Sequence, residues 1–231
     1  MTPNLARALA SLVVAFAAGP LHAALITSAS DLANTSTFNF DTPAGSNLSD
    51  PVALGNGVTF STTGGPGSIG EAPTGAWTLG SNGFWSASKT FAGVDGDFDG
   101  AGEPASMIFD FGDNPVSGAG GFLNFDPDFT YGDPLSLPLP LYIAAYDAQG
   151  NLIEGHELPL FTPDGFNDGA FYGISIDDPT IAQFVISGPY AVVDDLTVAG
   201  NAVAIPEPAT PALLLACIGL ATLLGRRRGR S

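Results

Sequence analysis

The stretch LYIAAYDAQGNLIEGHEL, residues 141–158, shows most clearly how this chain folds. Two runs rich in β-forming residues, 141–146 and 152–158, flank a five-residue turn sequence, Asp147-Ala148-Gln149-Gly150-Asn151. Asp147 can cap the turn with its side chain, and Gly150 can adopt the positive φ that a tight turn requires. The stretch therefore predicts a β-hairpin.

Similar short runs recur along the chain, separated by residues that favour turns, and no segment keeps a helical period of apolar residues. They are residues 37–40, 58–61, 107–111, 121–125, 171–176, 181–186 and 191–198. About eight to eleven short strands at this spacing predict an all-β fold, an antiparallel two-sheet sandwich of jelly-roll type. Residues 43–104 are rich in loops and are the hardest to place.

The N-terminus favours export. Residues 1–7 hold one positive charge, residues 8–18 are apolar, and Leu21-His22-Ala23 ends on a small residue suited to signal peptidase. We expect a signal peptide at residues 1–23, with cleavage after Ala23 or one residue later. An uncleaved membrane helix is the alternative, but the apolar core of about 11 residues is short of the roughly 20 that span a bilayer.

The body expected at residues 24–200 is strongly acidic. Between Ala24 and Ile205 the chain has 22 of its 23 acidic residues and one basic residue, Lys89. Such a surface repels phosphate backbones, so the composition argues against nucleic-acid binding. Its carboxylates must be solvated, hydrogen-bonded or neutralised by cations.

The C-terminal end has three parts. A linker, residues 201–208, ends in Pro206-Glu207-Pro208; an apolar run fills residues 209–225; and residues 226–231 are rich in arginine. The apolar run predicts a single transmembrane helix of about 25 Å. The arginines should stay cytoplasmic, which places the acidic body outside. The two prolines keep Glu207 in an extended, accessible backbone.

This C-terminal arrangement closely resembles the PEP-CTERM sorting signal, which exosortases recognise in Gram-negative bacteria that make extracellular polysaccharide. Pro206, Glu207 and Pro208 match the motif, and Arg226, Arg227 and Arg228 match its basic end. The resemblance implies an inner-membrane intermediate, processing near the motif by an exosortase, and release to the cell surface or extracellular matrix. An ordinary membrane anchor with a proline-containing stalk is the alternative.

Two patterns in the body suggest calcium. Asp95, Asp97 and Asp99 alternate with other residues in a tight Gly-containing loop, which can converge on one hard cation. Ser106 stands where an EF-hand has its bidentate glutamate, so only a partial calcium loop is present. An acidic solvated turn is the alternative.

The second pattern is the adjacent pair Asp194 and Asp195 in the last expected strand. This ending resembles the last strand of jelly-roll carbohydrate-binding modules, which implies that Asp194 or Asp195 could ligate structural calcium together with Asp41. Only one aspartate of the pair can point inward, because successive strand residues face opposite ways. A charged edge strand is the alternative.

Aromatic side chains could bind sugars. Trp77 and Trp85 lie among Gly, Ser and Asn, where exposed rings can stack on pyranose faces. Burial in the core is the alternative for both. Catalysis has little support, because the expected body has one histidine, His156, and no nucleophile motif. Glu154 and Glu157 could act as a glycosidase pair, but two acids among 22 carry little weight.

The sequence thus predicts an exported, non-enzymatic surface or matrix protein, sorted through its C-terminus and associated with exopolysaccharide. A calcium-dependent carbohydrate-binding module is the alternative, and a glycoside hydrolase is the least favoured.

Overall fold

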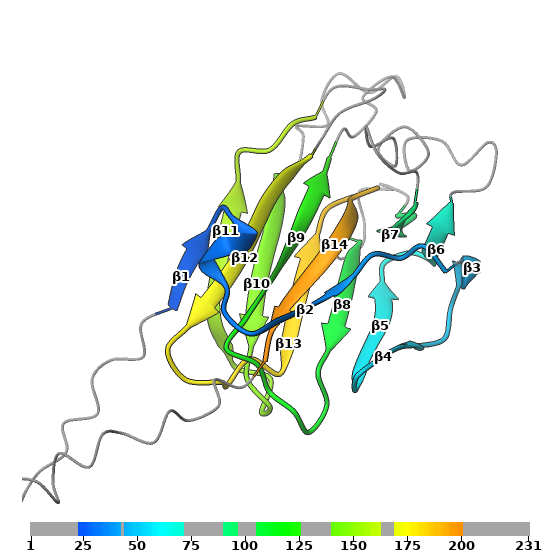
Figure 1. The fold of residues 1–231 in the computed structure, drawn as a ribbon. Helices are drawn as coiled ribbons and strands as arrows, with labels where there is room; N and C mark the ends of the chain where they lie inside the picture. Colours follow the sequence, from blue (N-terminus) through cyan, green and yellow to red (C-terminus); the bar gives the residue numbers. More distant parts are fainter. Residues whose placement is uncertain are drawn as a thin grey trace, which may run out of the picture.

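The computed structural model describes residues 23–42, 44–71, 90–96, 105–125, 140–162 and 169–200. In these residues two antiparallel sheets face each other, as Figure 1 shows. The larger sheet, sheet A, has the order β1-β12-β9-β14-β7-β6-β3, and β2 also pairs with β14. The smaller sheet, sheet B, has the order β11-β10-β13-β8-β5-β4. The predicted all-β sandwich is confirmed.

The strands are short, as the spacing of turn residues predicts. Those of sheet A are β1 Ala23–Ile26, β2 Thr35–Phe38, β3 Gly45–Leu48, β6 Gly67–Glu71, β7 Thr90–Val94, β9 Gly118–Asn124, β12 Ala170–Ile176 and β14 Val192–Ala199. Those of sheet B are β4 Val52–Gly55, β5 Val58–Thr63, β8 Ser106–Asp110, β10 Leu141–Tyr146, β11 Leu152–Leu158 and β13 Gln183–Ser187. A short 3-10 helix, η1 Ala29–Asp31, follows β1.

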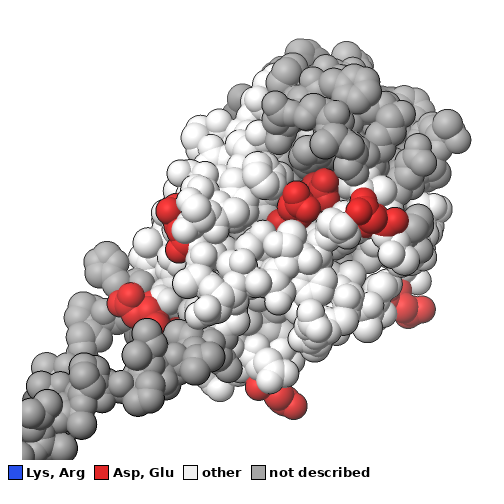
Figure 2. All heavy atoms as spheres, in the orientation of Figure 1, with Lys and Arg blue, Asp and Glu red and all other residues white. Residues whose placement is uncertain are grey.

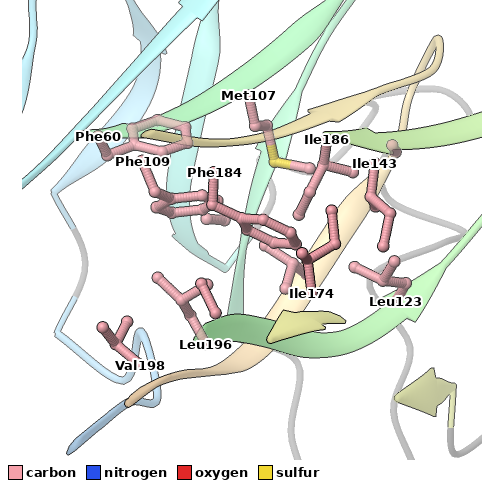
Figure 3. Close-up of a cluster of buried hydrophobic side chains, with 14 of the residues drawn as sticks. Phe60, Met107, Phe109, Leu123, Ile143, Ile174, Phe184, Ile186, Leu196 and Val198 are labelled. Atoms are coloured by element: carbon pink, nitrogen blue, oxygen red, sulfur yellow. The ribbon is translucent and has the colours of Figure 1, made fainter. Parts of the chain in front are cut away.

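The main core lies between the two sheets (Figure 3). Phe60, Phe109 and Phe184 are each at most 1% exposed, and the rings of Phe60 and Phe109 lie 5.5 Å apart between centroids. Sheet A contributes Leu123, Ile174 and other aliphatic side chains to the same cluster. Burying each such side chain contributes about 1.5–3 kcal/mol, so this core is the main source of stability.

The hairpin at residues 141–158 forms as predicted. β10 pairs antiparallel with β11, from Leu141 opposite Leu158 to Tyr146 opposite Leu152. In the turn, Asp147 Oδ1 accepts hydrogen bonds from the backbone N–H groups of Gln149 and Asn151, at 2.9 and 2.8 Å. Gly150 has a φ of +78°. The turn chemistry read from the sequence is therefore the chemistry that closes the hairpin.

The sequence reading missed part of the sheets. The structure has fourteen strands in the described residues, more than the eight to eleven predicted, and five of them had no predicted counterpart: β1, β3, β4, β6 and β7. β3 and β4 are only four residues long, and β6 and β7 contain glycines that weaken a strand signal. The predicted strand at 181–186 is also shorter than expected, because Ile181 makes only an isolated bridge to Val116.

No helix in the described ranges is long and apolar enough to cross a membrane. The expected signal peptide at 1–23 lies outside the described residues except for Ala23, and the expected transmembrane helix at 209–225 lies wholly outside them.

Candidate functional site

The site with the most distinctive geometry is a junction in sheet A where β14 changes its neighbour. Along one edge, β14 pairs first with β7, where Val192 and Val193 face Gly93 and Ala92. It then pairs with β2, starting at Leu196 opposite Phe38. Asp194 and Asp195 occupy the gap between the two pairings. We call Asp41, Asp194 and Asp195, with Asn39 and Thr90 beside them, the acidic junction.

A β-bulge shapes this junction. Asp195 has a φ of +48°, and the register of β14 against β9 shifts between Asp194 and Thr197. A bulge re-aims side chains and breaks the strict alternation of a strand. The Thr197 hydroxyl donates to the backbone carbonyl of Asp195, at 3.0 Å, which helps to hold the bulge.

Asp41 reaches the junction from the chain that follows β2. Its carboxylate accepts hydrogen bonds from the Thr90 hydroxyl at 2.8 Å and from the Asn39 side-chain amide at 2.6 Å. Thr90 is the first residue of β7, so these contacts connect the two strands that β14 pairs with in turn. Phe40, between Asn39 and Asp41, has a φ of +53° and is buried. With Phe40 in this left-handed conformation, its ring enters the core and the next residue, Asp41, stays exposed.

Asp194 is the buried acid of the group, with 7% of its surface exposed, whereas Asp195 is half-buried. Its cross-strand partner on β9 is Phe122. The pKa of Asp194 is raised to about 6, mainly by burial and to a smaller extent by the nearby charges of Asp195 and Asp41. A hydrogen bond from the Asp195 backbone N–H opposes the shift. Phe122 packs with Val192 in a small cluster separate from the main core between the sheets, so the burial of Asp194 does not test the prediction that one aspartate points inward.

The junction offers oxygen atoms but only a small carboxylate group. Within the described residues, no three His, Cys, Asp or Glu side chains are grouped so that they could hold a metal ion. The oxygens present are those of Asp41 and Asp194, which interact electrostatically, together with Asn39 and Thr90 around Asp41. Carboxylate, amide and hydroxyl oxygens are ligands suited to Ca²⁺ rather than to soft metals.

The residues that the structure describes place no positive side chain at the junction. The described residues include no lysine or arginine, and the face in Figure 2 shows separate groups of Asp and Glu on an otherwise uncharged surface. No ammonium or guanidinium group of this part of the chain can therefore neutralise Asp194. Protonation or a bound cation would remove its charge without such a group.

Sequence reasoning identified Asp41, Asp194 and Asp195 but missed Asn39 and Thr90. Asn39 could have been found, because it stands two residues before Asp41 in the same short segment. Thr90 carried no sequence signal, since its role depends on the distant pairing of β7 with β14.

Most of the other predicted sites lie outside the described residues. Of the partial calcium loop only Asp95 is described; it is half-buried, and its backbone N–H donates to the carbonyl of Pro66 at 2.9 Å. Asp97 and Asp99 are not described, and neither are Trp77 and Trp85. The sorting residues Pro206, Glu207, Pro208, Arg226, Arg227 and Arg228 also lie outside the described ranges.

The two glutamates considered for glycoside hydrolysis lie on β11, at an edge of sheet B. Glu154 and Glu157 are three positions apart, and an odd spacing along a strand directs side chains to opposite faces. Glu154 instead pairs with His156, with 2.9 Å between Oε1 and Nε2.

The described residues form a β-sandwich with an acidic composition and a buried aspartate, Asp194, at a strand junction. Comparison with protein families identifies a sorting signal at the C-terminal end of the chain. The family model of the PEP-CTERM protein-sorting motif matches residues 204–228. The chain thus carries the signal by which exosortases recognise their substrates, which implies export and processing at a membrane. No curated protein and no solved structure matched the chain.

Proposed function

We propose that this chain is an exported, non-enzymatic protein of a Gram-negative cell surface or extracellular matrix, where its sandwich associates with exopolysaccharide. The observation that carries the proposal is the sorting motif at residues 204–228. A signal peptide at residues 1–23 starts the route, the C-terminal helix holds an inner-membrane intermediate, and an exosortase processes the chain near Pro206–Pro208.

The acidic body supports this destination. With 22 acidic residues against one lysine in residues 24–205, it stays soluble and does not bind nucleic acid or anionic lipid. The opposite facing of Glu154 and Glu157 supports a role without catalysis.

The test is a pair of variants expressed in a host with and without an exosortase. Glu207→Ala should leave the precursor in the membrane fraction, whereas Glu157→Ala, at an exposed position of β11, should be processed like the natural chain. Processed protein should then resist washing from the matrix of a polysaccharide-producing strain, and wash freely from a strain that makes none. Equal processing of Glu207→Ala would contradict the sorting role, and equal washing would contradict the polysaccharide association.

A second candidate function is a calcium-dependent carbohydrate-binding module, and the buried Asp194 favours it. Calcium held by Asp194, Asp41 and the oxygens around them would neutralise a carboxylate that has no cationic side chain beside it in the described residues. Ligand binding to the folded state alone stabilises a protein by mass action.

Melting temperatures test the calcium site. Calcium at neutral pH should raise the melting temperature by about 5 °C or more, and a chelator should reverse the rise. Asp41→Asn should abolish the response, while Asp50→Asn, at an exposed position before β4, should keep it. A calcium response no larger than that of magnesium at equal ionic strength would contradict the site.

A further inference from the structure

An uncharged hollow lies at the end of the sandwich where β2 pairs with the last residues of β14. Its volume is about 140 Å³. We call it the β2 hollow. Its floor belongs to both sheets, with Val58 and Phe111 from the side of sheet B and Val198 from β14. These three side chains are at most 6% exposed, so the floor is a rigid part of the core.

Polar groups surround the opening of the hollow. Asn56 lies in the β4–β5 turn, Asn114 lies in the connection between β8 and β9, and Ser36 lies on β2 opposite Val198. Both asparagines are exposed, and so is Ser36. The three side chains offer amide and hydroxyl groups that donate and accept hydrogen bonds.

The backbone places the two asparagines on adjoining turns. Asn56 and Gly57 have φ angles of +51° and +80°, the left-handed pair typical of a tight hairpin turn. A Cβ built on Gly57 would lie 3.4 Å from Asn114 Nδ2, so the turn packs directly against the Asn114 side chain. The backbone segments that carry the two carboxamides therefore lie next to each other.

The chemistry of the lining selects the ligand. None of the ten lining residues is charged, although the chain is strongly acidic. A cavity of about 150 Å³ accommodates one benzene-sized ring, whereas drug-sized ligands need about 300 Å³ or more. The half-buried Phe38 side chain gives the hollow some aromatic surface, which suits the C–H face of a sugar ring.

From these features we propose that the β2 hollow binds one neutral pyranose residue of a glycan. The Phe38 side chain contacts the ring above the apolar floor, and Asn56, Asn114 and Ser36 bind its hydroxyl groups. A uronic acid or a phosphate is disfavoured, because the hollow has no cationic group and the protein around it is negative. This inference deepens the proposed polysaccharide association and rests on it for its biological setting only.

Nuclear magnetic resonance on the isotopically labelled processed protein tests the proposal. Methyl glycosides of neutral hexoses should shift the side-chain amide signals of Asn56 and Asn114 together, along one saturation curve. Asn114→Ala should weaken binding about tenfold, the effect of one lost hydrogen bond in a small interface. Asn56→Gly should weaken it similarly, because glycine keeps the turn's positive φ while removing the carboxamide.

The matched control is Gln149→Ala. Gln149 is an exposed carboxamide in the β10–β11 turn, at the opposite edge of sheet B, and its loss should leave binding unchanged. No shift of either asparagine up to the solubility limit of the glycosides would overturn the proposal. Equal affinity of the natural protein and both asparagine variants would also overturn it. The same holds for equally tight binding of cyclohexanol, which has a six-membered ring but only one hydroxyl group.

The outcome is separable from that of the proposed function. If Asn114→Ala loses glycoside binding but the protein still resists washing from the matrix, the β2 hollow is a glycoside site and matrix association uses another surface. If the hollow binds no glycoside while washing still depends on polysaccharide, only this inference fails.

Discussion

Two aspartates in this molecule show how the same side chain acts in opposite ways. Asp147 lies in the exposed β10–β11 turn, where hydrogen bonds from the Asn151 side chain and from backbone N–H groups lower its pKa. Asp194 lies buried at the acidic junction, where burial raises its pKa to about 6. The turn stabilises the ionised carboxylate, and the junction stabilises the protonated one.

The difference also separates local from distant causes. The turn is closed by five consecutive residues, 147–151, so its chemistry can be read directly from the chain. The junction instead combines Asp41, Thr90 and Asp194 from three separate segments, which come close because β14 pairs first with β7 and then with β2. Mutations and pH changes should therefore affect the two regions with opposite sign and different size.

The sandwich core sets the scale for these effects. Phe184→Ala should lower the free energy of unfolding by about 3–5 kcal/mol, because it removes a fully buried ring. Phe161→Ala, at a position 62% exposed, should change it by less than about 0.5 kcal/mol. Urea unfolding of both variants measures the difference. A similar decrease in the free energy of unfolding for the two variants would mean that Phe184 is not part of the stabilising core.

Asp194→Asn should have the next largest effect, through pH. Because the folded pKa of Asp194 is raised, the folded state favours the protonated form. The contribution of protonated Asp194 to the free energy of unfolding is fully present below pH 4 and is lost as the pH rises towards 6. The loss is about 3 kcal/mol, because the pKa is raised by about two units. In calcium-free buffer, the natural protein should lose this stability between pH 4 and 7, and the asparagine variant should not.

Urea unfolding across that pH range checks the prediction, with Asp50→Asn as the control at an exposed position. The curves of Asp194→Asn and the natural protein should diverge above pH 4. Parallel curves would mean that the carboxyl of Asp194 is solvated, and the comparison between the two aspartates would break.

Asp147→Ala should have the smallest effect, with the opposite dependence on pH. The folded pKa of Asp147 is lowered, so its contribution is present above the ordinary value of 3.8 and is lost as pH falls through the lowered pKa. The melting temperature of the variant should lie slightly below that of the natural protein at pH 6. The two should converge near pH 2, and a constant gap would show that the turn is not stabilised by the ionised carboxylate.

The sequence predicted the parts of the fold that depend on neighbouring residues. The hairpin, the strands with β-branched or aromatic residues and the sandwich class all follow from local pattern. The edge strand β3 and the glycine-containing strands β6 and β7 did not, because their pairing comes from distant partners rather than from their own composition.

The candidate sites divide in the same way. The pair Asp194 and Asp195 was visible in the sequence, as was the sorting motif at 204–228. The β2 hollow was not, since Ser36, Asn56, Asn114 and Val198 come from four separate segments. Only the meeting of two turns and two strands makes these ordinary residues into a site.

The most direct test of the account is the intact mass of the protein recovered from outside the cells of an exosortase-containing host. Removal of the signal peptide and processing at the sorting motif predict a chain that begins at Ala24, or one residue later, and ends near Pro206–Pro208. Recovery of a chain that still carries Arg226–Arg230 would contradict the sorting account and indicate a permanent anchor.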